Sequence, residues 1–260
     1  MSRLDNKIIL ITGAGSGLGR ATAIRAAEEG ASLALVDISD DGLDDTVHEI
    51  SERVPDATVV TYTADVSKVD EVKKYVDGTL AEYGRIDGFF NNAGIEGKQN
   101  ETEDYGIDEF HRVIGVNLDG VFFGQRYVLA AMHEAGTGSI VNTASVGGIR
   151  GVGNQSGYAA AKHGVVGLTR NSAVEYGKYN VRINAIAPGV IWTPMVESSF
   201  EQIDPDNPEE AAEEFLSVNP MRRAGKPEEV ASVVTFLLSD DATFINGAVL
   251  PIDGGQSAQY

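Results

Sequence analysis

The start of the chain constrains its fold more than any other segment. Residues 7–12, KIILIT, are nearly all apolar and β-branched, which predicts a strand buried on both faces. This strand runs into a glycine-rich stretch, GAGSGLG at residues 13–19, and then into a helix-favouring segment that ends near residue 30. The order of strand, glycine turn and helix aims backbone N–H groups and a helix N-terminus at a phosphate group.

The glycines of this turn point to a ligand without proving one. Gly13, Gly17 and Gly19 have no side chains that would block the approach of a pyrophosphate. The common G-x-G-x-x-G pattern fails here, because Leu18 stands at its last position when the pattern is counted from Gly13. A glycine-rich turn without a ligand is therefore the alternative, since a lone glycine pattern is weak evidence.

The alternation of strands and helices continues to the end of the chain. Further runs that predict strands lie at 31–37, 57–63, 86–90, 139–144, 181–187 and 247–253. Further helices are expected at 67–83, 106–135, 157–178 and 226–240. The 260 residues contain no repeat or linker, so we expect one α/β domain over residues 1–260. Its doubly wound, Rossmann-type core would be a parallel sheet of about seven strands, with the ligand crevice at their carboxyl ends.

The end of the second predicted strand indicates which dinucleotide the crevice would hold. Asp37 lies about 20 residues beyond the glycines, where dinucleotide folds place an acidic residue on the ribose hydroxyls. A carboxylate there repels the 2′-phosphate of NADP, and no lysine or arginine follows within ten residues, so the sequence favours NAD. The alternative is that Asp37 only caps the next helix. Asp65 and Val66, after the third strand, are expected at the adenine edge.

The fourth predicted strand ends in the polar sequence NNAG, residues 91–94, where the cofactor should lie. We interpret Asn91 as a brace between strands. Asn92 is the better candidate for a cofactor contact, through its backbone as much as its side chain, and Gly94 is assigned to the same site.

Three residues in the next part of the chain have the chemistry of a proton donor. Tyr158 and Lys162 are four residues apart, so on a helix they share one face. An ammonium beside the phenol favours the phenolate and lowers the pKa of the tyrosine, which would then exchange a proton near neutral pH. Ser145 ends the run SIVNTAS and can donate a hydrogen bond to a carbonyl oxygen. Taken alone, an ordinary amphipathic helix after a serine-containing loop explains the same residues.

Asn117 lies in the middle of the helical segment 106–135, which we expect to be one long helix or a broken pair. Asparagine is a poor residue for a helix interior. A kinked helix would expose its carbonyl and amide to a buried water that leads to Lys162. An amide that faces solvent is the alternative.

The segment that follows the sixth strand is assigned partly to the cofactor and partly to the substrate. Pro188-Gly189 breaks the chain, with Thr193 soon after. Residues 190–222 then form a candidate substrate lid, since a run of acidic residues is flanked by bulky apolar ones such as Trp192 and Met195. An ordinary acidic pair of surface helices is about as consistent with this segment.

Composition excludes several other functions. The formal net charge of −19 argues against a nucleic-acid partner and against an anionic membrane surface. No run approaches the ~20 apolar residues of a membrane span. The chain has no cysteine, and its four histidines are scattered with no H-E-x-x-H, so neither thiol catalysis nor a metal site is expected. We expect a cytoplasmic protein.

Together these motifs resemble the short-chain dehydrogenase/reductase family over essentially the full chain. Residues 12–19 are similar to the family's T-G-x-x-x-G-x-G cofactor motif, and residues 91–94 match its N-N-A-G. The four residues that match its catalytic tetrad are Asn117, Ser145, Tyr158 and Lys162. The segment from Pro188-Gly189 through Ile191 to Thr193 matches the part that holds the nicotinamide amide, and Ser16 and Leu18 belong to the cofactor motif.

The resemblance implies NAD as cofactor and transfer of a hydride between nicotinamide and a ketone carbon. Tyr158 would supply the proton, Ser145 would hold the substrate oxygen, Lys162 would also bind ribose hydroxyls, and Asn117 would hold a relay water. It also implies a homotetramer with the long helices in one interface. Ile149, Val152, Trp192 and Met195 suit a small cyclic ketone or its alcohol. A sugar, polyol, steroid or 3-oxoacyl substrate is the alternative, as is a sensor that binds NAD without catalysis.

Overall fold

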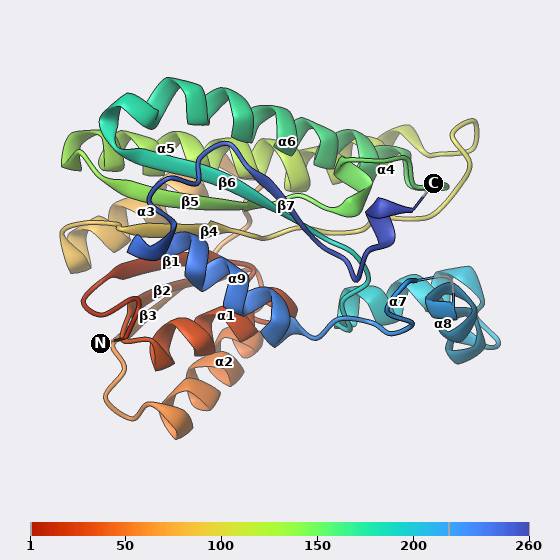
Figure 1. Cartoon of the computed structure of the whole chain (residues 1–260), viewed down its shortest axis with the longest axis horizontal. Coiled ribbons are helices and arrows are strands. Elements are labelled where there is room, and N and C mark those ends of the chain that lie inside the picture. Colours follow the sequence, from red (N-terminus) through yellow and green to blue (C-terminus); the bar gives the residue numbers. More distant parts are fainter. Residues whose placement is uncertain (1, 218, 260) are drawn as a thin grey trace.

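The computed structural model, which describes residues 2–217 and 219–259, is built on one seven-stranded sheet. All strands are parallel, in the order β3-β2-β1-β4-β5-β6-β7 (Figure 1). The strands are β1 (Ile8–Thr12), β2 (Ser32–Asp37), β3 (Val59–Thr63), β4 (Gly88–Asn91), β5 (Gly138–Thr143), β6 (Val181–Pro188) and β7 (Val249–Ile252). The expected fold class is therefore confirmed.

Helices cover both faces of the sheet, which is why its central strands are almost wholly apolar. The α-helices are α1 (Gly17–Glu28), α2 (Asp40–Arg53), α3 (Val69–Tyr83), α4 (Ile107–Ile114), α5 (Gly120–Ala135), α6 (Ser156–Tyr176), α7 (Pro194–Ile203), α8 (Pro208–Ser217) and α9 (Pro227–Leu238). Figure 1 shows α1, α2 and α9 on one face and α3, α5 and α6 on the other. No helix of the described residues is both long and apolar enough to cross a membrane.

The order of the strands decides where the ligand crevice lies. The chain starts at the centre of the sheet with β1, moves outward to β3, and returns to the other side of β1 with β4. Loops that follow β1 and β4 therefore leave the sheet in opposite directions and open a crevice at its carboxyl edge. The glycine turn after β1 and the NNAG segment after β4 both border this opening.

The segment 106–135 is a broken pair of helices rather than one regular helix. Its helices, α4 and α5, are joined without a gap by a π-helical turn, Gly115–Asp119. Across this turn the N–H of Gly120 bonds to the carbonyl of Gly115, five residues earlier, instead of four. Asn117 lies inside the turn, so the poor helix residue and the irregular helix coincide.

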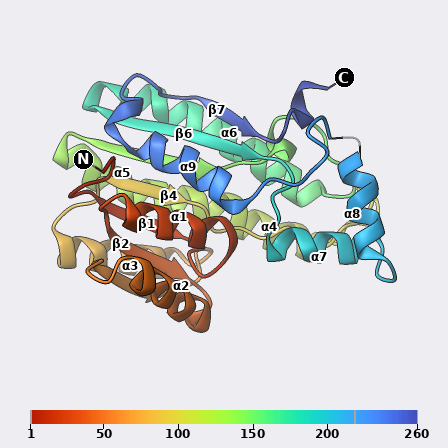
Figure 2. The same cartoon turned by 60° about the horizontal axis from the view of Figure 1, so that its bottom comes forward.

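Two regions differ from the expected elements. Helix α2 was not predicted, although Leu43, Val47 and Ile50 recur at helical spacing and pack into the core. The candidate lid contains two helices, α7 and α8, which pack on each other, and residue 218 of the predicted lid lies outside the described residues. Figure 2 shows α7 and α8 together at the edge of the molecule.

Candidate active site

A cavity of about 880 Å³ occupies the carboxyl edge of the sheet, where the predicted cofactor residues meet. Its wall combines the glycine turn, the ends of β2, β4 and β6, and the first turns of α6 and α7. The sequence-predicted residues in the wall are Gly13, Ser16, Gly17, Leu18, Asp37, Asp65, Val66, Asn92, Gly94, Ser145, Tyr158, Lys162, Pro188, Gly189, Ile191, Thr193 and Met195. They come from parts of the chain that only this topology brings together.

The glycine turn has the shape of a phosphate cradle. Gly13 and Gly17 have φ angles of +66° and +51°, a region that other residues rarely adopt. A Cβ on Gly19 would lie 1.9 Å from the carbonyl oxygen of Gly13, so the turn closes only around glycine. Ser16, the N-cap of α1, makes no side-chain cap bond. The first turn of α1 therefore has no side-chain cap, and it begins at residues that line the cavity, where a helix N-terminus favours an anion.

Asp37 stabilises the glycine turn and is not the cap of α2. Its carboxylate accepts hydrogen bonds from the N–H of Gly15 at 2.8 Å and of Ser39 at 3.0 Å. Helix α2 is capped by Ser39, whose hydroxyl accepts from the N–H of Gly42 at 3.0 Å. The helix-cap alternative is therefore wrong, and a carboxylate lies at the cavity wall beside the turn.

The two asparagines after β4 have different surroundings. The Asn91 amide is buried and donates to the carbonyl of Val121 on α5 and to Asn142 on β5, so the interpretation of Asn91 as a brace is confirmed. Asn92 lines the cavity, donates to the carbonyl of Thr12 at 3.0 Å and accepts from the Thr143 hydroxyl at 3.1 Å.

Ser145, Tyr158 and Lys162 meet at the cavity wall. Helix α6 begins at Ser156, so Tyr158 lies in its first turn and Lys162 one turn later, with its Nζ 5.5 Å from the centre of the Tyr158 ring. The Ser145 hydroxyl accepts from the N–H of Gly147 at 3.0 Å and makes a hydrogen bond with the Tyr158 phenol.

The expected lowering of the Tyr158 pKa is not found in the protein alone. Burial raises the pKa of the phenol, the hydrogen bond with Ser145 opposes this rise, and the Glu96 carboxylate adds to it. Lys162 is 3% exposed, and burial lowers the pKa of its amine to about 8. Its Nζ donates to the carbonyl of Thr143 at 2.8 Å, so this amine is held by the backbone rather than by the phenol oxygen.

Asn117 is fully buried, so the alternative of an amide that faces solvent is wrong. Its side chain accepts from the N–H of Ile95 at 2.8 Å and donates to the carbonyl of Ile95 at 2.7 Å. A Cβ on Gly94 would lie 2.9 Å from Asn117 Oδ1 and 3.4 Å from Lys162 Nζ. The π-helical turn therefore fixes the loop after NNAG and lies next to the lysine.

Five predicted site residues lie outside the cavity wall: Gly19, Asn117, Ile149, Val152 and Trp192. Gly19 and Asn117 support the wall from behind, as described above. Ile149 packs against a core cluster, and Val152 is 40% exposed on the loop before α6. Trp192 lines a second hollow outside the cavity and stacks on Phe200 of α7 with a centroid distance of 6.5 Å. Ile149, Val152 and Trp192, which we expected in the substrate pocket, therefore do not line the cavity.

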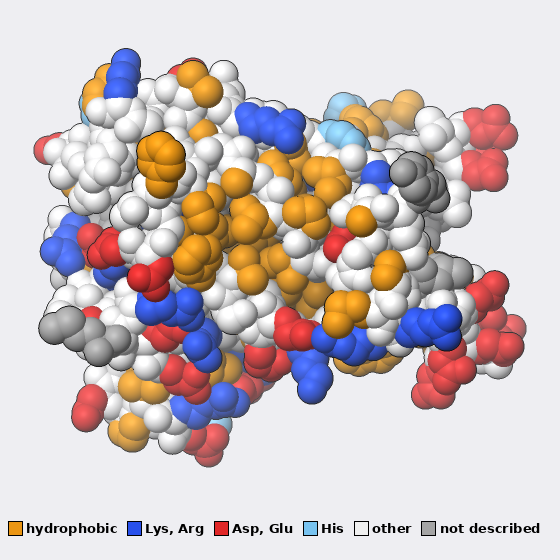
Figure 3. Space-filling view, in the orientation of Figure 1, with side chains coloured by type: hydrophobic (Ala, Val, Ile, Leu, Met, Phe, Trp, Pro, Cys, Tyr) orange, Lys and Arg blue, Asp and Glu red, His pale blue; other side chains and the backbone are white. Residues whose placement is uncertain are grey.

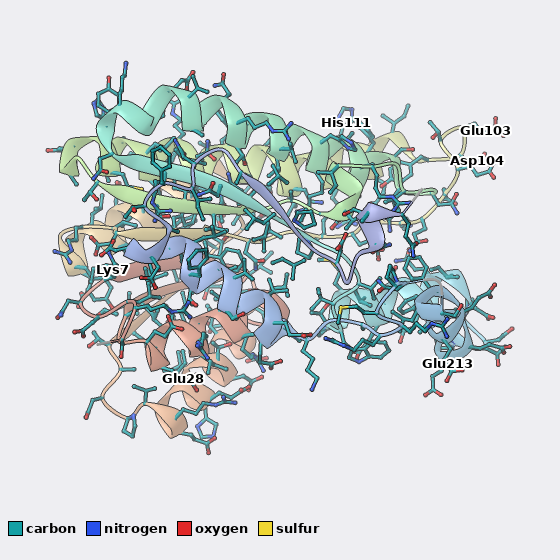
Figure 4. All side chains as sticks on the ribbon, viewed as in Figure 1. Lys7, Glu28, Glu103, Asp104, His111 and Glu213 are labelled. Atoms are coloured by element: carbon teal, nitrogen blue, oxygen red, sulfur yellow. The ribbon has the colours of Figure 1, made fainter. Side chains whose placement is uncertain are left out.

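The wall also contains residues that the sequence reasoning missed. Ile38 follows Asp37 directly, lines the cavity and is 71% exposed. A large apolar residue at the end of a strand was the sequence feature that could have indicated it. Ile95 and Val196 also line the wall. His111 of α4 lines the wall as well, and Figure 4 marks its position.

Comparison with known proteins identifies the family. A family model described as enoyl-(acyl carrier protein) reductase matches residues 13–257. The chain is 63% identical to levodione reductase of Leifsonia aquatica, covering 100% of this chain and 97% of the relative. It is 41% identical to cyclohexanol dehydrogenase of an Acinetobacter species, covering 99% and 98%.

Solved structures agree with these sequence matches. A crystal structure of levodione reductase superposes with a TM-score of 0.99 at 64% identity, covering 99% of this chain and 100% of that one. A structure of NAD⁺-bound xylitol dehydrogenase gives a TM-score of 0.91 at 36% identity, covering 97% and 100%. The chain belongs to the short-chain dehydrogenase/reductase family of oxidoreductases.

Proposed function

We propose that this chain is an NAD-dependent oxidoreductase that interconverts a cyclic ketone and its secondary alcohol. The main observation behind the proposal is that Ser145, Tyr158 and Lys162 line the same cavity as the glycine turn and Asp37. A sensor that only bound NAD would not need a proton donor in the same cavity. Relatives named for levodione and cyclohexanol support a cyclic substrate.

The residues of the wall fit a dinucleotide. The glycine turn would hold the pyrophosphate, the Asp37 carboxylate the adenosine ribose, and Lys162 the nicotinamide ribose. The positive φ angles of Gly13 and Gly17 keep that part of the wall free of side chains. When bound, the nicotinamide supplies a hydride to a carbonyl carbon or takes one from an alcohol carbon.

Tyr158 and Ser145 handle the oxygen at which charge develops. In reduction, the Tyr158 hydroxyl gives its proton to the substrate oxygen, and in oxidation the phenolate takes the alcohol proton. The N–H of Gly147 orients the Ser145 hydroxyl, whose proton can be donated to that oxygen in place of the Tyr158 phenol. The Lys162 ammonium, one turn along α6, stabilises the phenolate form.

A substrate panel with both nicotinamide cofactors tests this function. Purified protein should oxidise NADH with substituted cyclohexanones and cyclohexanediones and should run the reverse reaction with cyclohexanols. Linear sugars, polyols, steroids and 3-oxoacyl thioesters belong in the same panel. Turnover of one of these classes alone would reject the cyclic substrate, and NADH binding without any turnover would reject the enzyme.

Asp37 provides a prediction about the cofactor. Asp37→Ala should lower kcat/KM for NADH by about 10- to 100-fold, since a hydrogen bond to a charged group is lost. The same change should raise the relative use of NADPH, because the repulsive charge is gone. Asp37→Asn keeps an acceptor for the Gly15 N–H, so it should gain NADPH activity with a smaller loss of NADH activity. Kinetics with each cofactor measure both effects.

Asp41→Ala is the matched control, because Asp41 is an exposed carboxylate in the first turn of α2, away from the cavity wall. An unchanged ratio of NADH to NADPH activity in both Asp37 variants would contradict the assignment of Asp37 to the ribose.

We also propose that residues 190–222 act as a lid over the substrate. Met195 and Val196, in the first turn of α7, line the cavity. Phe200 is buried between Trp192 and Phe215, which joins α7 to α8. Acidic side chains of α8, such as Glu213, point outward (Figure 4). The segment therefore has an apolar inner side and a charged outer side, as a mobile cover needs.

A homotetramer is the assembly that we propose. Phe122 on α5 and Val174 on α6 are 43% and 85% exposed, and large exposed apolar side chains are typical of interfaces. Strand β7 pairs on one side only, and Figure 3 shows hydrophobic side chains gathered on the face where β7 lies. Two such surfaces support contacts about two axes. Sedimentation velocity should give the mass of four chains, and a monomer would contradict the proposal.

A further inference from the structure

Glu96 is a carboxylate near the active site that the function described above does not use. It follows NNAG by two residues and makes no ion pair with any described residue. Its Oε1 accepts three hydrogen bonds, all from neutral groups: the Ser199 hydroxyl at 2.7 Å, the Gln155 amide at 2.6 Å and the Gln99 amide at 3.3 Å. Its Oε2 is buried without a hydrogen-bond partner among the described residues. An uncompensated carboxylate is costly to bury, which argues for a role beyond packing.

The first of these contacts reaches the lid. Ser199 lies on α7, one helical turn beyond the cavity-lining residues Met195 and Val196. Two further bonds support this contact, because the Gln202 amide oxygen accepts from the N–H of Gln99 at 3.2 Å and its nitrogen donates to the carbonyl of Gly97 at 3.3 Å. The loop after NNAG therefore holds α7 at two consecutive turns.

The second contact reaches the catalytic helix. Gln155 is the N-cap of α6, and its carbonyl accepts from the N–H of Ala159, the residue after Tyr158. The loop after NNAG and the loop before α6 are also joined by the N–H of Asn100, which donates to the carbonyl of Asn154 at 2.9 Å. One carboxylate oxygen therefore connects the lid helix to the first turn of α6.

We propose that Glu96 is a positioning residue, which fixes the lid helix α7 against the first turn of α6 so that the substrate wall and Tyr158 keep one relative placement. This inference rests on the proposed function, since it assigns Met195 and Val196 to the substrate side. Glu96 itself does not line the cavity, so it acts through Ser199 and Gln155 rather than by touching the substrate.

The charge of Glu96 gives the proposal a second readout. The Glu96 carboxylate raises the pKa of two phenols, those of Tyr158 and Tyr105. Glu109 and Arg112 of α4 also act on Tyr105, and they neutralise each other as an ion pair. Among the described residues, Glu96 is the carboxylate that raises the pKa of Tyr158, and the amine of Lys162, 5.5 Å from the Tyr158 ring, is the cation that faces the same ring. Removal of the Glu96 charge should let Tyr158 lose its proton at lower pH.

Four single variants and one double variant test the proposal. Glu96→Ala should raise KM for the cyclic ketone about tenfold, with the Kd of NADH within about twofold of wild type, because the lid loses its anchor and the cofactor cradle does not. Ser199→Ala removes the same contact from the other side. If both act through one contact, the double variant should be no worse than Glu96→Ala within about twofold, instead of showing the product of the two effects.

Glu96→Gln keeps one acceptor oxygen and removes the charge. The acidic limb of the pH profile of alcohol oxidation, where activity rises as Tyr158 loses its proton, should therefore move to lower pH by about half a unit, while KM changes less than in Glu96→Ala. Glu197→Gln is the matched control, since it makes the same chemical change on the exposed side of α7. It should leave both KM and the pH profile unchanged.

Amide hydrogen exchange separates this proposal from the proposed function. Residues 194–203 should exchange faster in Glu96→Ala and Ser199→Ala than in wild type or Glu197→Gln, whether or not any ketone is turned over. A wild-type protein without activity would reject the function and leave this measurement intact. Unchanged exchange of α7, or multiplicative effects of the two substitutions, would overturn the anchoring role of Glu96.

Discussion

Replacing Tyr158 by phenylalanine should lower kcat for ketone reduction by about 10²- to 10⁴-fold, the range that a positioned proton donor contributes. The substitution removes one oxygen from a side chain that is partly exposed at the cavity wall, so the fold and the Kd of NADH should change little. Stopped-flow measurement of NADH oxidation, together with NADH fluorescence titration, gives both quantities on the same sample.

Tyr176→Phe is the control for this change. Tyr176 ends the same helix, packs against His133 and Tyr179, and lies far along α6 from the cavity. It should keep full activity. Equal activity of Tyr158→Phe and wild type would remove the proton donor from the mechanism and with it the main support for an enzyme.

The location of the site at the carboxyl ends of the strands was predictable, because all these ends lie at one edge of a parallel sheet. Asp37, Asn92, Ser145 and Pro188 each follow or end an apolar run, so periodicity alone places them together. The π-helical turn at Asn117 was predictable only as an irregularity, since a poor helix residue indicates a break without giving its geometry. Helix α2 was not predicted, because its few apolar residues are interspersed with many acidic ones and the helical spacing is therefore weak in the sequence.

The substrate side was less predictable than the cofactor side. Trp192 seemed a natural pocket residue from its place after Pro188-Gly189, but its orientation depends on how Phe200 packs beneath it. Glu96 had no sequence signal at all. Its hydrogen-bond partners Gln155 and Ser199 lie 59 and 103 residues away, so only the folded chain shows that a lone loop carboxylate connects two helices.

Without a bound cofactor, the pKa values of Tyr158 and Lys162 are set mainly by burial. In the protein alone, burial raises the pKa of Tyr158 and lowers that of Lys162 to about 8, so at pH 7 the phenol keeps its proton and the amine is still mostly an ammonium. The ammonium that the spacing of the two residues suggested is therefore present, but the phenolate is not. Pairing within helix α6 is therefore insufficient, because burial is the largest effect on both pKa values and the Lys162 amine donates to the Thr143 carbonyl rather than to the phenol oxygen.

Lys162→Met is expected to lower activity and to raise stability. Activity should fall by about 10²- to 10³-fold, because the charge that stabilises the phenolate is lost. The wild-type amine has a pKa of about 8 in the folded chain and an ordinary value near 10.4 when unfolded. Between these values the unfolded chain binds more protons, so the contribution of Lys162 to stability rises with pH in that window and is lost as pH falls through 8.

At pH 7 the native chain therefore bears the full cost of a buried ammonium, and methionine of similar shape removes it. The lost hydrogen bond to Thr143 offsets part of this gain, which leaves about 1 to 2 kcal/mol of added stability. Urea titrations at pH 7 and pH 10 should show this gain at pH 7 and a smaller one at pH 10, whereas Lys74→Met, on the exposed face of α3, should show neither. A loss of stability at pH 7 that stays the same or shrinks toward pH 10 would mean that the ammonium is stabilised in the folded chain, so that its pKa is not lowered there.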